Sequence, residues 1–144
     1  IGVMVKFDTD NSIENKPEFK QYAKDIAMQV AAANPLYLNK KSVPADVIEH
    51  EKKILTEQVI NEGKPEKIAE KIVMGKLGKF YKENCLVDQI FVKDSDLTVS
   101  KYTEKVAKEL GKNIAILAFE RFEKGEGLEK REDNFADEVA SMIK

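Results

Sequence analysis

The sequence predicts an α+β fold, in which a small antiparallel sheet carries helices on one face and an antiparallel helical hairpin, a coiled coil, protrudes from it. Segments 2–8 and 113–123 have the character of strands. Between them, apolar residues recur at helical spacing, and two such stretches are joined by a tight reversal. A chain of 144 residues can bury one modest core, so we expect one domain with an appendage.

The first elements follow from their apolar patterns. Residues 2–8 are β-branched and apolar, and a polar turn follows them. A helix begins near Pro17, because apolar residues from Phe19 to Ala31 form one stripe at helical spacing. Asn34-Pro35 ends this helix, since the residue before a proline avoids the helical conformation.

The hairpin is expected between Pro44 and Glu83, with its reversal at 61–65. Gly63 can take the left-handed conformation that ends a helix, and Pro65 can open the next one because its missing N–H is not needed there. Gly75 is costly inside a helix, and we expect a close approach of the two helices to offset that cost. The apolar seam is predicted to join Val47, Ile48, Ile54, Leu55 and Val59 to Ile68, Ala69, Ile72, Val73, Leu77, Phe80 and Tyr81.

The last third of the chain predicts a short extended segment at 87–92 and a helix at 98–110 that stops at Gly111. The strand at 113–123 follows, and a final helix is expected at 133–143. We therefore divide the chain into a core of residues 1–43 and 86–124, an inserted hairpin of residues 44–85 and a C-terminal module of residues 125–144. Because Ile1 opens directly into a strand without an initiator Met, we expect the chain to be part of a longer protein.

Composition narrows the class of partner. The 24 basic and 26 acidic residues are intermixed, with a formal net charge of −2, so no strong signal points to nucleic acid or an anionic membrane. No apolar run approaches the ~20 residues that a membrane span needs. Cys85 is the only cysteine, which excludes an intrachain disulfide and suits a reducing cytoplasm.

Three features invite catalytic or cofactor chemistry and do not support it. His50 is the only histidine and lacks partners at metal-ligand spacing, so a solvated helix residue is the favoured interpretation. Cys85 has no second histidine to activate it, and a buried free thiol is expected. Gly125-Glu126-Gly127 lacks the Lys-Ser/Thr of a phosphate loop, and its acids would repel phosphate. We predict no enzyme activity, no cofactor, no metal and no direct nucleotide binding.

Two surfaces leave alternatives open. The lysines of segment 71–82, with Phe80 and Tyr81, could form a basic RNA surface, but Glu66, Glu70 and Glu83 dilute it and favour a solvated face. The terminal helix carries Phe135, Val139 and Met142 at helical spacing. A helix this short cannot hold itself together, so it must dock on this domain or on a partner.

Four segments together resemble elongation factor Ts, the guanine-nucleotide exchange factor of elongation factor Tu. They are LTEQVINEGKPEKIAEKIVMGKLGKFYK at 55–82, GEGLEKREDNFADEV at 125–139, FVKD at 91–94 and AMQVAAANP at 27–35. The resemblance covers nearly the whole chain, in the family's order and at consistent spacing.

The resemblance implies a role in translation elongation: the chain would bind elongation factor Tu and promote GDP release without chemistry of its own. A Thr-Asp-Phe-Val motif that intrudes near the magnesium site in the family is missing, since Thr9-Asp10-Asn11-Ser12 has no Phe or Val to insert. This chain would then supply anchoring contacts, with the motif in another part of the parent protein. The expected location is the bacterial cytoplasm, with an organelle matrix as the alternative.

The resemblance also implies the contact residues. They are Ile1, Gly2, Gln29, Asn34, Pro35 and Phe119, completed on the terminal helix by Phe135, Val139 and Met142. Gln29 departs from the family, where His is frequent, although Gln can still form hydrogen bonds. The hairpin's own role is open between homodimerisation and a second partner. The alternative function is a self-associating structural or RNA-associated helical-hairpin protein.

Overall fold

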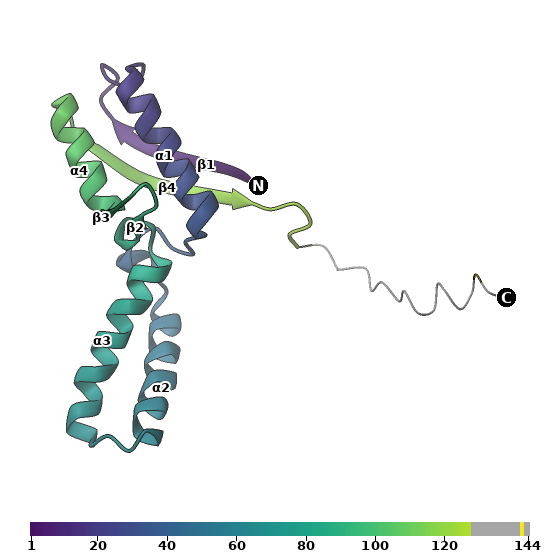
Figure 1. Ribbon diagram of the computed structural model, residues 1–144, viewed down its shortest axis with the longest axis vertical. Coiled ribbons are helices and arrows are strands. Elements are labelled where there is room, and N and C mark those ends of the chain that lie inside the picture. Colours follow the sequence, from purple (N-terminus) through teal and green to yellow (C-terminus); the bar gives the residue numbers. More distant parts are fainter. Residues whose placement is uncertain (128–141, 143–144) are drawn as a thin grey trace.

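A computed structural model describes residues 1–127 and residue 142 of the chain (Figure 1). A two-stranded sheet and two helices form a core, from which a helical hairpin extends. The elements are β1 (Gly2–Thr9), α1 (Pro17–Ala33), η1 (Lys40–Ser42), α2 (Ala45–Asn61), α3 (Glu66–Asn84), η2 (Leu86–Asp88), β2 (Ile90–Phe91), β3 (Asp94–Thr98), α4 (Val99–Leu110) and β4 (Ile114–Phe122). The α+β class and the small antiparallel sheet are confirmed.

Strands β1 and β4 pair antiparallel although they lie at opposite ends of the described chain, as predicted. Gly2 pairs with Phe122 and Thr9 with Ile114, and the register shifts at a bulge between Lys6 and Phe7. Alternate residues of β1 are half-buried and exposed, as expected when one face of a sheet is covered. Helices α1 and α4 lie on that covered face (Figure 1).

The core lies between the sheet and these two helices. Tyr22 and Ile26 of α1 and Val99 of α4 are fully buried. The hydroxyls of Tyr22 and Thr103 are 2.7 Å apart, so the buried phenol has a polar partner. Burial raises the pKa of Tyr22 to about 12. The apolar stripe predicted for the first helix is therefore the stripe that builds the core.

The predicted helix boundaries hold at the caps. Pro17 is the first residue of α1, and Asn34 takes a left-handed conformation, with φ 45°, at its end. The Thr98 hydroxyl accepts a hydrogen bond from the Lys101 N–H at the start of α4. Gly111 ends α4 with φ 68°, a conformation that glycine adopts without steric cost.

Helices α2 and α3 pack against each other through an apolar cluster of their own, formed by Leu55, Val59, Ala69 and Val73 with Ile72 beside it. Gly63 has φ 77° at the reversal, as predicted. Two expectations are wrong. Ile54 and Ile68 are 38% and 51% exposed and lie outside the seam. A Cβ added at Gly75 would meet nothing within 4 Å, so no close helix approach offsets this glycine. The coiled-coil geometry of the hairpin stays a prediction.

A second sheet corrects the expectation for residues 87–98. Strands β2 and β3 form a small antiparallel hairpin, where the sequence predicted a short extended segment at 87–92 and a helix from residue 98. The β3 stretch begins Asp94-Ser95-Asp96, residues that are rare in strands, so the sequence did not indicate a strand there. The β2 side of the hairpin is held by a buried amide, described below.

Candidate functional site

Three of the predicted contact residues line one open groove of about 480 Å³. Asn34 and Pro35 enter it from the end of α1, and Phe119 enters it from β4. The left-handed conformation of Asn34 turns the chain out of α1, and its N–H donates to the Val30 carbonyl at 3.1 Å. Residues separated by more than eighty positions are thereby brought together at one end of the core.

The wall of this groove is fixed to the base of the hairpin. The N–H groups of Leu36 and Tyr37 both donate to the Asn84 carbonyl, at 2.9 and 3.0 Å, and the Leu86 N–H donates to the Tyr37 carbonyl at 2.9 Å. With its backbone held in this way, the Leu36 side chain remains 61% exposed on the groove. It is an exposed apolar residue of the groove that the sequence did not indicate, because its exposure follows from the backbone path and not from any periodicity.

Arg121 is a second groove residue that the sequence did not single out. Its side chain is only 16% exposed, and Nη2 donates to the Ala31 carbonyl at 3.5 Å at the end of α1. Its Nη1 lies 3.4 Å from the Glu123 carboxylate. Within the described residues its Nε is buried and has no hydrogen-bond partner. The guanidinium therefore links the end of α1 to β4 beneath the groove and keeps one donor unused.

Ile1 and Gly2 lie at the same end of the sheet but on another surface. Gly2 pairs with Phe122, and Ile1 is 69% exposed. Further large apolar side chains are exposed on β1 and β4, with Met4 at 68% and Phe122 at 55%. These exposed apolar residues, Ile1 included, lie at the end of the sheet near Arg121, which lines the groove.

Gln29 occupies a different environment from the other predicted residues, because it is fully buried. Its Nε2 donates to the Ile90 carbonyl at 3.1 Å and to Gln89 Oε1 at 3.3 Å, and its Oε1 accepts from the Val92 N–H at 2.9 Å. Both polar atoms of this amide are engaged with the β2–β3 hairpin and the residue before it. Gln29 holds that hairpin on α1 and offers no exposed surface to a partner.

A buried carboxylate fixes the turn of the same hairpin. Asp25 accepts hydrogen bonds from the Lys93 ammonium, the Tyr102 hydroxyl and the Gln21 amide. Burial alone would raise the pKa of Asp25, but these three donors together hold it below its ordinary value. Burial and the hydrogen bond to Asp25 raise the pKa of Tyr102, whose ring stacks on Phe91 with centroids 4.2 Å apart.

The three features of the sequence that invited catalytic or cofactor chemistry are His50, Cys85 and the turn at 125–127. His50 is exposed on α2, and Cys85 is fully buried, with a pKa raised by burial and by Asp88. Gly125 and Gly127 have positive φ in a turn, where the Glu123 N–H donates to the Glu126 carboxylate. Across residues 1–127, no cluster of His, Cys, Asp or Glu could hold a metal ion.

The remaining predicted contact residues belong to the C-terminal segment. Phe135 and Val139 lie outside the described residues, whereas the Met142 side chain is described and 83% exposed. None of the helices in the described part of the chain combines the length and hydrophobicity that crossing a bilayer requires.

Comparison with known proteins identifies a family. The family model described as Elongation factor TS matches residues 1–126. Elongation factor Ts of Clostridium kluyveri is 54% identical over 143 residues, and that of Clostridium botulinum strain ATCC 19397 is 52% identical over the same length. These matches cover 99% of this chain and 46% of each relative, so the chain spans about half their length. The chain belongs to the elongation factor Ts family.

Proposed function

We propose that this chain is the part of a guanine-nucleotide exchange factor that anchors elongation factor Tu during translation elongation. The observation that carries the proposal is the groove, where Asn34, Pro35 and Phe119 lie together beside the exposed Leu36. Burying an exposed apolar side chain against a partner is favourable, by roughly 25 cal/mol per Å² of apolar area removed from water. The exposed apolar residues at the end of the sheet, Ile1 included, would extend the contact.

Exchange by such a protein requires no chemistry in this chain. If the protein binds elongation factor Tu more tightly without GDP than with it, reciprocity requires that its binding weaken GDP by the same factor. The anchoring residues then contribute affinity, and the distortion of the nucleotide site is made by another segment.

The segment closest to the intruding motif is engaged in its own turn. The Ser12 N–H donates to Asp10 Oδ1 at 2.8 Å, and the Ile13 N–H donates to the Asp10 carbonyl at 3.1 Å. Ile13, the nearest large apolar residue, is 1% exposed and packs in the core. This turn has no side chain to insert into a partner, which supports a purely anchoring role. We assign the intruding function to the part of the parent protein that this chain does not span.

The residues expected at the contact with elongation factor Tu would contribute in different ways. We propose direct contacts for Leu36, Phe119 and Ile1, and a supporting role for Gln29 through the β2–β3 hairpin. We also propose that Phe135, Val139 and Met142 contact elongation factor Tu, as the family resemblance implies. The bacterial source of the relatives supports a bacterial cytoplasmic location.

Leu36→Asp tests the groove, because Leu36 lies in the groove and its side chain is largely exposed. Binding to nucleotide-free elongation factor Tu, measured by isothermal titration calorimetry, should weaken at least about tenfold, equivalent to about 1.4 kcal/mol. Ile68→Asp is the matched control, since Ile68 is 51% exposed on the hairpin. That control should change affinity by less than about threefold. Equal effects of the two substitutions would contradict the assignment.

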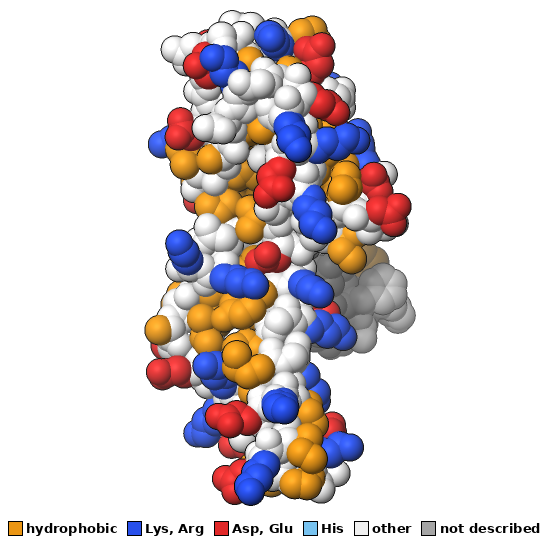
Figure 2. All heavy atoms as spheres, turned by 90° about the vertical axis from the view of Figure 1, so that its left-hand side faces the viewer, with side chains coloured by type: hydrophobic (Ala, Val, Ile, Leu, Met, Phe, Trp, Pro, Cys, Tyr) orange, Lys and Arg blue, Asp and Glu red, His pale blue; other side chains and the backbone are white. Residues whose placement is uncertain are grey.

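A self-associating helical-hairpin protein is the second candidate. It is favoured by the exposure of Ile60 and Met74, at 54% and 59%, on the two helices of the hairpin. On the face shown in Figure 2, hydrophobic side chains also gather over the lower, hairpin half. A concentration-dependent mass without binding to elongation factor Tu would favour this candidate over the exchange factor.

A further inference from the structure

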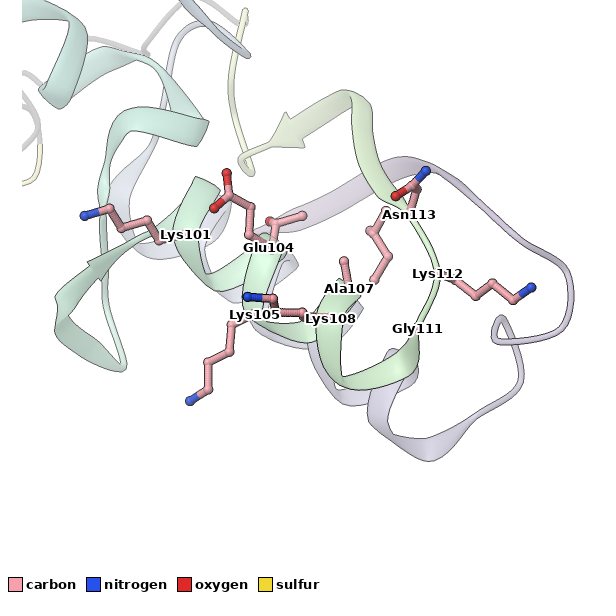
Figure 3. A pocket seen from close by; sticks show the side chains of 10 residues that line it. Lys101, Glu104, Lys105, Ala107, Lys108, Gly111, Lys112 and Asn113 are labelled. Carbon is pink, nitrogen blue, oxygen red and sulfur yellow. The ribbon is translucent and has the colours of Figure 1, made fainter.

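The exposed side of α4 carries a row of lysines. Lys101, Lys105, Lys108 and Lys112 follow each other at intervals of four, three and four residues, which places them on one side of the helix and its C-terminal turn. They line a groove of about 1050 Å³. Figure 3 shows Lys101 and Lys112 reaching out in opposite directions, with Lys105 and Lys108 between them. We call these four residues the α4 lysine face.

Within residues 1–127 one of these four lysines forms an ion pair, and Glu104 and Glu109 lie on the same helix. Lys112 lies 3.6 Å from the Asp10 carboxylate, but none of the ion pairs formed within residues 1–127 includes Lys101, Lys105 or Lys108. Among the described residues, Glu104 is the one carboxylate lining the groove. By contrast, Lys76 and Lys79 of α3 each lie 3.8 Å from a glutamate. Lys67, Lys71 and Lys82 of α3 are likewise outside these ion pairs, so what distinguishes the α4 lysines is that they line one groove together.

The groove, as the described residues form it, lacks the features that a protein or a membrane would need. Its apolar lining consists of Ala107 and the half-buried Ile114, with no aromatic side chain. The large apolar residues of α4, Val99 and Val106, face the core. Without an apolar anchor there is no hot spot for a protein partner, and no apolar face of α4 remains to insert into lipid.

Phosphate groups fit this chemistry. Lysine ammonium groups bind phosphates as point charges, and rows of them bind a nucleic-acid backbone without reading its sequence. Proteins that bind single strands use aromatic platforms for the bases, which the described lining of this groove does not include. A duplex, whose phosphates face outward and whose bases are stacked inside, needs no such platform. The family's place in translation favours RNA over DNA.

The α4 lysine face is separate from the groove assigned to elongation factor Tu. Ile114 begins β4 at the lysine face, and Arg121, near the other end of that strand, lines the other groove. Leu117 also lines that groove, so along β4 the two linings come within three residues of each other, or roughly 10 Å at about 3.3 Å per residue. The two linings share no residue.

We propose that the α4 lysine face binds the phosphodiester backbone of double-stranded RNA. Binding should be weak and independent of sequence. With four phosphate contacts, raising the salt from about 50 to about 200 mM should lower the affinity about a hundredfold.

Fluorescence anisotropy with a labelled RNA duplex of about 20 base pairs, without elongation factor Tu, tests this proposal at low salt. The triple variant Lys101→Glu/Lys105→Glu/Lys108→Glu should reduce the affinity by more than about tenfold. Lys64→Glu/Lys67→Glu/Lys71→Glu is the matched control, because these lysines are also exposed and the net charge changes equally. It should reduce the affinity by less than about threefold. The corresponding Lys→Gln variant of α4 should give a smaller loss in the same direction.

Four outcomes would overturn the proposal. The first is no binding of the RNA duplex at low salt. The second is an equal loss in the α4 variant and its control, which would mean that only overall charge matters. The third is displacement of the RNA by polyglutamate at equal charge concentration, which would indicate an acidic protein partner. The fourth is tighter binding of a DNA duplex of the same sequence.

Discussion

Gln29 illustrates how one side chain can support a surface that it does not reach. It is fully buried, and its amide accepts from one backbone N–H and donates to one backbone carbonyl of the segment 90–92. The small β2–β3 sheet is held in place by this amide, by Asp25 and by the stacked ring of Phe91. Residue 29 is therefore a structural support in this chain.

Gln29→Ala should lower the free energy of unfolding by about 1–3 kcal/mol, because it removes the hydrogen bonds of the buried Gln29 amide to the Ile90 carbonyl and the Val92 N–H. Urea denaturation followed by circular dichroism measures this change. Gln58→Ala, at an exposed position of α2, is the control and should stay within about 0.5 kcal/mol of the parent. A loss in the Gln29 variant no larger than that of the control would show that the buried amide does not hold the hairpin.

Asp25 should make stability depend on pH in the acid range. Its folded-state pKa lies below the ordinary value of 3.8, so its contribution is present above that value and is lost as the pH falls through the lower folded pKa. Asp25→Asn should be less stable than the parent at pH 7 by about 1.5–3 kcal/mol, the range for hydrogen bonds to a charged group. The difference should shrink in acid as the parent loses this contribution.

Unfolding free energies of both proteins, measured from neutral pH downward, check this expectation. The pKa of Asp10 is also lowered, by hydrogen bonds from Ser12 and by Lys112. Because Asp10 is present in both proteins, its contribution cancels in the difference between their unfolding free energies. A difference that stayed constant into the acid range would contradict the role of Asp25.

The role of a single residue could be predicted from the sequence where the residue acts only on its own backbone conformation. Gly63, Gly111 and Asn34 act on their own backbone conformation, so the sequence alone indicated them. Leu36 and Arg121 were not predictable, because their importance comes from elements that meet only in the folded chain. Gln29 was assigned to a contact by resemblance, and only the structure places its amide in the interior.

At the scale of elements, the hairpin is held by a narrow seam of apolar residues. The apolar positions of α2 and α3 were predictable from their spacing, but which of them face the seam was not. Ile54 and Ile68 fit the helical period nearly as well as Leu55 and Ala69, and only the relative rotation of the two helices separates them. The β2–β3 hairpin was missed for a related reason, since its polar residues are ordered by tertiary hydrogen bonds.

Gly75 and Gly78 give a direct test of the hairpin. Both lie inside α3, and a Cβ added at either position would meet open space, so alanine fits without a clash. Gly75→Ala and Gly78→Ala should each raise the free energy of unfolding by about 0.5–1 kcal/mol, because alanine is the better helix former. Thermal unfolding of each variant measures the gain.

Gly63→Ala is the matched control for these two substitutions. It also meets no neighbour, but its φ of 77° strains any residue with a Cβ. The same glycine-to-alanine change should therefore destabilise the chain at the reversal by about 1 kcal/mol. Destabilisation at Gly75 or Gly78 would mean that the helix is not formed there in solution.

At the scale of the whole molecule, the two assigned surfaces use different residues of the same strand, β4. The groove with Leu36 and Phe119 is near the base of the hairpin, and the α4 lysine face is where β4 begins. On the face shown in Figure 2, charges of both signs are interspersed. The nearly balanced total charge could not predict this division, because local excesses of opposite sign cancel in the total.

We propose that this chain anchors elongation factor Tu without exchanging its nucleotide. The experiment that tests this follows the release of a fluorescent GDP analogue from elongation factor Tu, with and without this chain, beside a binding titration under the same conditions. We expect binding, weakened by Leu36→Asp, with no acceleration of GDP release. Acceleration by this chain alone would contradict the division between anchoring and intruding segments, and absence of binding would contradict the anchoring role itself.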